Sequence, residues 1–340
     1  MGATGAKELS DKIDLSQVGA YWERPARKLL VYSSVSCRVV GNPSDATHNR
    51  SPSSNGHHTT APTLSHHLAG QRLCGYSATA MPCTVVFVRH AQALHNDYDI
   101  PDPPLSDLGV QQCAVLRESL LERFGHVAAT DVTVIVSPMR RTLQTATIAL
   151  DWLLERGVGF EANADWQENS CKPCDTGSPV AAIAPDFPHV SFANVAPCWP
   201  DKTSAAAAPF AYTRTAILAR GQRALEGLYD DVTATTTATG MTTNGPPPNR
   251  LIIVVSHSGF LRLAVTGWWF FNADYRLFEL GYGDLSSGKD ESRPRSLLLR
   301  QDESTLTGGL GWSSTERVTL GEDLPDEDDG GVPEAMFASG

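Results

Sequence analysis

Thr84 to Asn96 reads Thr-Val-Val-Phe-Val-Arg-His-Ala-Gln-Ala-Leu-His-Asn, so an apolar run leads directly into a cationic pair. The segment from Val85 to Val88 has no polar alternation, which predicts a strand that is covered on both faces of a sheet. Arg89 and His90 follow at its carboxyl end, where open α/β sheets usually bind their ligands. A guanidinium beside an imidazole at that place predicts an anionic substrate.

Two more predicted strands end in residues of the same kind. Val132 to Val136 runs into Ser137-Pro138-Met139-Arg140-Arg141, and Leu251 to Val255 runs into Ser256-His257-Ser258-Gly259. The carboxyl ends of parallel strands meet at one edge of a sheet, so these segments should bring their cationic side chains to one face. Glu168 is expected to join them from a loop.

Helical patterns follow the predicted strands. Ser106 is a plausible N-cap for a helix with an apolar face of Cys113, Leu116 and Leu120. Further helices are indicated at 146–153, at 218–228 and from Phe260, and weaker strands at 157–164, 276–280 and 296–299. This alternation predicts an α/β domain of three layers, with a mainly parallel sheet and helices on both faces.

The chain divides by composition into three parts. Residues 1–80 are rich in Ser, Thr, Gly, Ala and His without a helical or strand period, so a disordered segment is expected there. Residues 81–301 form the predicted domain, with insertions at about 170–212 and 232–249, and Met81 is a candidate physiological start. Residues 302–340 are expected to be an acidic, solvated tail.

Charge and cysteine content narrow the function classes. The net charge of −11 argues against nonspecific binding to nucleic acid or to an anionic membrane surface. There is no apolar run long enough for a membrane span and no apolar core of a secretory signal, so a cytoplasmic location is expected. The seven cysteines are an odd number scattered over a long chain, which favours reduced thiols.

Arginines, histidines and a carboxylate on one face fit phosphoryl transfer. The transition state spreads charge over the equatorial oxygens, which need donors around them. A neutral imidazole can attack phosphorus and form a covalent intermediate. A partly shielded carboxylic acid can protonate the departing oxygen and then act as base for water.

The motifs Val88-Arg89-His90-Ala91, Ser137-Pro138-Met139-Arg140-Arg141 and Ser256-His257-Ser258-Gly259 resemble those of the histidine phosphatase superfamily, also called phosphoglycerate mutase-like. The resemblance spans about residues 83–282. It implies that His90 is the phosphorylated nucleophile, that Arg89, Arg141 and His257 clamp the phosphoryl group, and that Glu168 is the proton donor. It also implies that Asn96 lines the phosphate pocket and that Ser258 contributes to substrate binding, with no metal and no cofactor.

Several departures and alternatives stay open. Family members commonly carry Gly where this chain has Ala91, which matters mainly if the backbone needs a positive φ. Arg140 is an alternative to Arg141, Asp165 and Asp175 are alternatives to Glu168, and His95 lines the pocket or caps its loop. The segment Cys171-Lys-Pro-Cys-Asp-Thr-Gly-Ser resembles fungal-type branches of the family, and its thiols are interpreted as structural. The aromatic cluster of residues 268–271 is expected to pack in the core.

The expected activity is that of a metal-independent histidine acid-type phosphatase, a hydrolase that acts on a small phosphorylated metabolite through phospho-His90. Two alternatives remain: a phosphoglycerate mutase-type transfer at the same site, and a non-hydrolytic module that only recognises phosphate. The sequence does not predict the natural substrate or the oligomeric state.

Overall fold

The computed structural model describes residues 83–94, 100–238, 250–283 and 296–326, all of which lie in the compact unit Ala78–Gly340. The predicted disordered segment 1–80 lies outside these residues. Seven strands form one sheet in the order β4-β3-β2-β5-β1-β6-β7. The strands are β1 (Cys83–Arg89), β2 (Val132–Val136), β3 (Phe160–Ala162), β4 (Val190–Ser191), β5 (Leu251–Ser256), β6 (Tyr275–Gly283) and β7 (Ser296–Gln301).

The sheet is mainly parallel, as predicted. The pairs β1 with β5, β2 with β5, β2 with β3 and β3 with β4 are parallel, and only β6 and β7 add antiparallel pairs at one side. In the register of the central strands, Arg89 lies opposite Ser256 and Val136 lies opposite Val255. The three motifs at the strand ends are therefore neighbours at one edge of the sheet.

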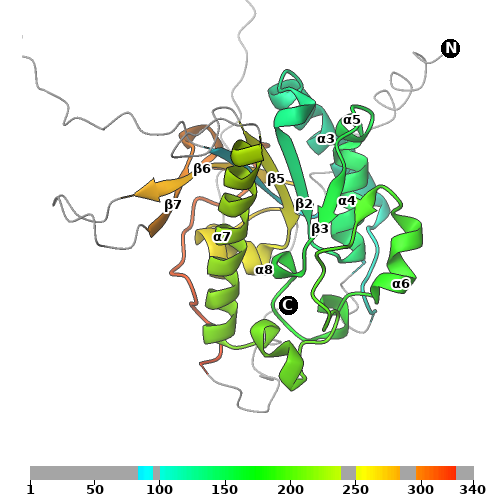
Figure 1. Ribbon diagram of the computed structural model, residues 1–340, viewed down its shortest axis with the longest axis vertical. Helices are drawn as coiled ribbons and strands as arrows, with labels where there is room; N and C mark the ends of the chain where they lie inside the picture. The colour runs from blue at the N-terminus through cyan, green and yellow to red at the C-terminus, as the bar shows by residue number, and fades with distance from the viewer. Residues whose placement is uncertain (1–82, 95–99, 239–249, 284–295, 327–340) are drawn as a thin grey trace, which may run out of the picture. The chain divides into compact units, whose positions relative to one another are not determined.

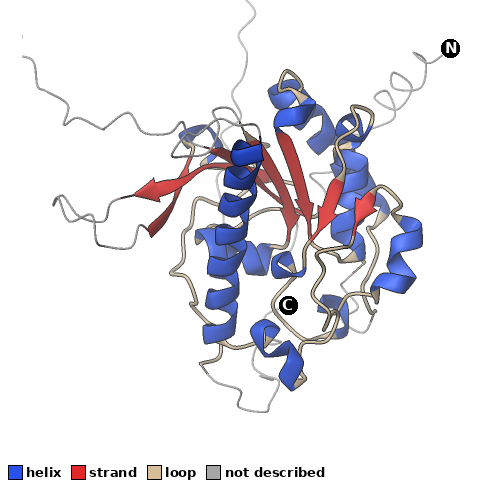
Figure 2. Cartoon of the chain, in the orientation of Figure 1, coloured by secondary structure: helices blue, strands red, loops and turns tan. Residues whose placement is uncertain are grey.

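Helices cover both faces of the sheet, which confirms the predicted three layers. They are α3 (Asp107–Phe124), α4 (Arg140–Ala149), α5 (Asp151–Leu154), α6 (Val180–Ile183), α7 (Arg214–Ala238) and α8 (Ser258–Phe260). Figure 1 shows α7 and α8 on one side of the strands and α3 and α4 on the other, and Figure 2 shows the strands as a central layer between helices.

Alternate residues of β1 supply the two cores. Val86 and Val88 pack with the apolar sides of α3, α4 and α5, whereas Val85 and Phe87 pack with α7 and α8. These four side chains are fully buried, which explains why the strand has no polar alternation. Within the described residues, no helix is both long and apolar enough to cross a membrane.

Short helical turns connect the main elements, and two other helical segments differ from the prediction. The turns are η1 (Ala129–Asp131), η2 (Ala164–Trp166), η3 (Pro173–Asp175), η4 (Ala184–Asp186), η5 (Ala205–Phe210) and η7 (Glu303–Thr305). The helix predicted from Phe260 is instead the short α8 followed by a π-helical stretch, η6 (Leu261–Thr266), which ends at Gly267 with φ 77°. The predicted insertion from residue 232 begins as helix, because α7 continues to Ala238.

The prediction of a solvated tail from residue 302 differs from the structure, because residues 302–326 pack on the domain. The buried carboxylate of Asp274 accepts hydrogen bonds from the backbone N–H of Leu310 (2.9 Å) and Trp312 (3.2 Å) and from the Ser313 hydroxyl (2.6 Å). The guanidinium of Arg276, also buried, donates to carbonyl oxygens of the same segment at Thr305, Leu306 and Ser314. Two charged side chains, Asp274 directly before β6 and Arg276 within it, thus hold a segment whose own composition is polar.

Replacing Asp274 with alanine is expected to destabilise the domain. The substitution leaves the donors on Leu310, Trp312 and Ser313 without their acceptor. Breaking a buried charged network of this kind costs about 3 to 5 kcal/mol of unfolding free energy. Urea denaturation followed by tryptophan fluorescence measures the change.

The matched control is Asp302→Ala in the same segment. Asp302 is exposed, and its side chain caps η7 by accepting from Ser304 N. Loss of such a cap typically costs about 1 kcal/mol. If the two variants lose equal stability, Asp274 is not the anchor of the segment.

Candidate active site

His90 lies at the carboxyl end of β1 and is almost fully buried. Its backbone N–H donates to Ser256 O on the neighbouring strand β5 (2.9 Å), which fixes the start of the loop. The ring Nδ1 lies 2.6 Å from Ala91 O, and the ring Nε2 lies 3.2 Å from Arg141 Nε. A carbonyl only accepts and an arginine Nε only donates, so Nδ1 carries the proton and Nε2 presents its lone pair.

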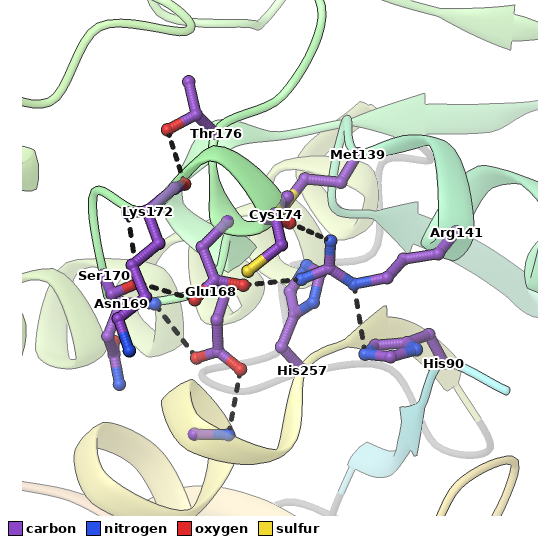
Figure 3. Close-up of polar contacts among 12 residues, drawn as sticks. His90, Met139, Arg141, Glu168, Asn169, Ser170, Lys172, Cys174, Thr176 and His257 are labelled. Carbon is purple, nitrogen blue, oxygen red and sulfur yellow. Dashed lines mark hydrogen bonds and ion pairs between the residues drawn. The ribbon is translucent and has the colours of Figure 1, made fainter. Parts of the chain in front are cut away.

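Arg141, in the first turn of α4, is the arginine that contacts His90. In addition to Nε, its Nη1 donates to Cys174 O (2.6 Å) and its Nη2 pairs with Asp175 Oδ1 (3.0 Å). Figure 3 shows the guanidinium between His90 and the segment that carries Cys174. Arg140 points elsewhere and forms an ion pair with Asp186 at the surface, so of the two alternatives Arg141 is the one at the site.

Arg89 is held at the strand end by the aromatic cluster of residues 268–271. Its Nη1 donates to Phe270 O (2.8 Å), and its guanidinium lies 5.8 Å from the ring centroid of Trp269. Burial lowers the pKa of Arg89 to about 10, with nearby Arg141 acting in the same direction, so the side chain is still charged at neutral pH. Phe270 packs in the core as expected, but the cluster also positions a candidate phosphate ligand.

His257 follows β5 and is fully buried. Its Nε2 is 2.9 Å from Ser137 Oγ, while Nδ1 has no hydrogen-bond partner within the described residues. Burial, with the positive charge of Arg141 as a second cause, holds the pKa of His257 well below the usual value for histidine, so the ring is neutral at physiological pH. Its ring centroid lies 5.1 Å from that of His90, which places a second imidazole beside the candidate nucleophile.

Glu168 reaches the site from the loop after β3. Trp166, packed between the rings of Phe87 and Phe260 with centroid distances of 5.6 and 5.8 Å, anchors this loop in the core. The Glu168 carboxylate accepts from Asn169 N (2.9 Å) and from Gly259 N (3.2 Å). Burial, then the nearby charge of Asp175, raises the pKa of Glu168, which favours the protonated form that a general acid needs.

Gly259 makes room for that carboxylate. A Cβ atom at this position would lie 2.5 Å from Glu168 Oε1, closer than real Cβ contacts allow. The glycine of the Ser-His-Ser-Gly motif therefore serves the approach of Glu168. Ser258, beside it, donates its hydroxyl to Phe270 O (3.2 Å), the carbonyl that also accepts from Arg89.

The two alternatives to Glu168 have other partners. Asp165 forms an ion pair with Arg223 at 2.6 Å. Asp175 pairs with Arg141 and also accepts from Ser170 Oγ at 2.6 Å. Asp175 therefore orients the arginine, and Glu168 is the carboxylate with a raised pKa at this site.

Ala91 fits where family members commonly carry glycine. It is fully buried, and it is not among the non-glycine residues with positive φ in the described part of the chain. Its N–H donates to Thr145 Oγ1 (3.0 Å), and that hydroxyl donates to Arg141 O (2.7 Å). The threonine thus connects the loop after His90 to the helix that carries Arg141.

Three residues hold segments of the site through hydrogen bonds to distant parts of the chain, and the sequence did not predict them. The Asp102 carboxylate accepts from Arg140 N at the start of α4 and from Ser178 N, both at 2.9 Å. Lys202 donates to backbone carbonyls of the loop that carries Glu168. Arg220, on α7, donates to Asn169 Oδ1 at 2.7 Å. No local motif marks these residues, because their partners lie far away in sequence.

The remaining predicted residues are Asn96, His95 and the two cysteines of the segment 171–178. Asn96 and His95 lie outside the described residues. Cys171 is exposed and Cys174 is buried, and both are free thiols. Burial raises the pKa of the Cys174 thiol to about 11, so it is not a reactive thiolate at neutral pH. Across the described ranges, no group of three or more His, Cys, Asp and Glu side chains is placed to hold a metal ion.

The geometry suits the handling of a phosphoryl group. An imidazole lone pair, two guanidinium groups, a neutral second imidazole and a carboxyl group with a raised pKa come from β1, α4, β5 and the loop after β3. The cations can neutralise phosphoryl oxygens, and the lone pair can attack phosphorus.

The family model of the histidine phosphatase superfamily (branch 1) matches residues 85–289, which is more than half of the chain. The protein therefore belongs to the histidine phosphatase superfamily. A comparison with curated proteins gives no match.

Solved structures similar to this chain include three from bacteria. A mycobacterial glucosyl-3-phosphoglycerate phosphatase in complex with VO3 is 20% identical, with 64% of this chain and 97% of that chain covered and a TM-score of 0.35. An Escherichia coli protein described as a putative alpha-ribazole-5'-P phosphatase is 14% identical, with 65% and 97% covered and a TM-score of 0.36. A phosphoglycerate mutase from Bacillus anthracis is 13% identical, with 58% and 88% covered and a TM-score of 0.33.

Proposed function

We propose that this protein is a phosphomonoester hydrolase that acts on a small phosphorylated metabolite through a phosphohistidine at His90. The observation that carries the proposal is the fixed state of the His90 ring, with Nδ1–H bound to Ala91 O and the Nε2 lone pair directed at Arg141. A nucleophile requires an unprotonated nitrogen, and here that nitrogen lies beside the guanidinium that will receive the phosphoryl oxygens.

In the first step, His90 Nε2 attacks phosphorus while the bond from phosphorus to the ester oxygen breaks. Glu168 donates its proton to that oxygen, and the alcohol leaves. Arg89, Arg141 and His257 stabilise the charge that spreads over the remaining phosphoryl oxygens. The hydrogen bond from Nδ1 to Ala91 O stabilises the positive charge that the imidazole gains when its Nε2 is phosphorylated.

In the second step, water attacks the phosphorus of phospho-His90. The Glu168 carboxylate takes a proton from the water, and the phosphorus–nitrogen bond breaks. The electron pair returns to Nε2, and inorganic phosphate is released. The same carboxyl group thus serves as acid and then as base, so it ends the cycle protonated.

We propose that no metal takes part, and the two guanidinium groups support this. They lie where positive charge is needed in phosphoryl transfer, a place that metal ions fill in kinases and GTPases. The contacts of Arg141 to His90 and of Arg89 to Phe270 hold the two cations at the strand ends. Activity is therefore expected to survive EDTA.

The test is a panel of phosphomonoesters with inorganic phosphate as the readout. Purified protein should release phosphate in the presence of EDTA, and brief incubation followed by alkaline quenching should trap an acid-labile phosphoenzyme. If vanadate binds tightly while no ester in the panel turns over, the chain is instead a phosphate-recognising module.

Product analysis separates the hydrolase from the mutase-type alternative. A mutase returns the phosphoryl group from His90 to a second hydroxyl, so isomeric esters would form with little phosphate. Net release of phosphate should dominate for a hydrolase. We also propose a cytoplasmic location, for which the free thiols of Cys171 and Cys174 are the supporting observation.

A further inference from the structure

Lys202 is a buried lysine whose ammonium contacts one segment of backbone. It is 5% exposed, and Nζ donates to Glu168 O (2.8 Å), Ser170 O (2.7 Å) and Asp175 O (2.5 Å). An ammonium has three N–H groups, so these contacts use its whole donor capacity. The residue lies in the 170–212 excursion, and the sequence predicted no role for it.

The three carbonyls belong to the segment that carries the chemistry of the site. Glu168 is the candidate acid, and Asp175 orients Arg141. Burying a charged lysine on neutral carbonyls is unfavourable, and burial lowers the pKa of Lys202 to about 7. Within the described residues, Lys202 forms no ion pair with a side chain. A buried cation of this kind is better explained by the backbone that it holds than by a gain in stability.

One peptide group links Lys202 to the Glu168 carboxylate. The carbonyl of Glu168 accepts from Lys202, and the N–H of the same peptide, that of Asn169, donates to Glu168 Oε1 at 2.9 Å. The peptide is planar and trans, so its oxygen and its hydrogen point in opposite directions. Fixing the oxygen therefore fixes the direction of the hydrogen that holds the carboxylate.

We propose that Lys202 is a positioning residue for the acid and base of this site: by holding the peptide between Glu168 and Asn169, it keeps the Glu168 carboxyl group in place for the leaving oxygen. The inference rests on the proposed function of Glu168. Without Lys202, the peptide is free to rotate, and the carboxylate loses its contact with Asn169 N.

The experiment compares two aryl esters of similar shape in the full-length chain. Phenyl phosphate releases a phenol with a pKa of about 10, like that of tyrosine, so its departure depends on proton donation. p-Nitrophenyl phosphate releases a much more acidic phenol that departs without help. The comparison uses kcat/KM, because this constant reports only the first step, in which the phenol leaves, whereas the second step is the same for both esters. Lys202→Met should lower kcat/KM for phenyl phosphate by about 10²-fold, the cost of a catalytic group out of place by about 1 Å, and should change kcat/KM for p-nitrophenyl phosphate little.

Two controls separate positioning from a merely structural role. Lys172→Met removes the other lysine of this segment and should leave the ratio of the two rates unchanged. In a Glu168→Gln background, Lys202→Met should cause no further loss for phenyl phosphate, because residues that act through one another are not additive. Equal losses for both esters, or full additivity with Glu168→Gln, would overturn the inference.

If Lys202→Met does not fold, Lys202→Arg carries the same test. A planar guanidinium cannot meet three carbonyls arranged around one nitrogen, so phenyl phosphate should again lose more than p-nitrophenyl phosphate. Equal losses in this variant also overturn the inference. A wild-type protein that hydrolyses neither ester would refute the proposed function instead.

Discussion

Replacement of His90 with alanine is expected to abolish turnover, with kcat lowered by at least about 10⁴-fold, because no other side chain can take over the covalent step. The nearby His257 cannot replace it, since it lies at the end of the neighbouring strand β5, with its ring centroid 5.1 Å from that of His90. The variant should also form no acid-labile phosphoenzyme. Release of phosphate from p-nitrophenyl phosphate measures the first effect, and alkaline-quenched samples measure the second.

His126→Ala is the matched control for this prediction. His126 is exposed in the turn after α3, so its loss should leave turnover unchanged. A thermal melt of the His90 variant should show that it is folded at the assay temperature. This check is needed because the substitution also removes a buried ring that contacts Ala91 O and Arg141. Turnover close to that of the wild type in the His90 variant would refute the nucleophile assignment.

Glu168→Gln is expected to have the second largest effect. The amide keeps the shape of the side chain but cannot donate a proton to the leaving oxygen, so phenyl phosphate hydrolysis should fall by about 10² to 10⁴-fold. p-Nitrophenyl phosphate should lose less in its first step, and phosphoenzyme should accumulate because the base for water is gone. The control is Glu226→Gln on the exposed side of α7, which should change neither rate.

The pH dependence follows from the raised pKa of Glu168. Because burial and Asp175 disfavour its charged form, Glu168 stays protonated at pH values where an exposed glutamate is ionised. As pH rises through this raised pKa, the acid is lost, and hydrolysis of phenyl phosphate should fall. The descending limb should be absent in Glu168→Gln. If the descending limb persists unchanged in that variant, the limb reports the titration of a group other than Glu168.

The sequence predicted the strand ends well because those signals are local. The run Val85 to Val88 is buried on both faces, and the motif residues that follow each central strand do meet at one edge. Ser106 also caps α3 as predicted, since its hydroxyl accepts from Gly109 N. In each case the physical cause lies within a few residues of the signal.

The missed features depend on contacts that are distant in sequence. Lys202 and Glu168 are held together through a backbone oxygen, which no residue pattern records. The choice between Arg140 and Arg141 depended on the direction of two neighbouring side chains, and the structure places Arg141 against His90. The end of the domain was placed at residue 301 because the composition that follows is polar. The residues that order this polar segment are distant in sequence: Asp274 lies directly before β6 and Arg276 lies within it.

Asp274 also contacts Arg89, one of the residues of the candidate active site. Its carbonyl accepts from the N–H of Arg89 at 3.1 Å, while its carboxylate holds the segment around Leu310. The family match stops at residue 289, well before that segment. A truncated protein designed from family boundaries alone would therefore lose the segment that holds the carboxylate of Asp274, the residue whose carbonyl contacts Arg89, the arginine proposed to bind phosphate. A shortened protein for expression and for comparing variants should extend at least to Asp326, because Asp326 forms an ion pair with Arg214.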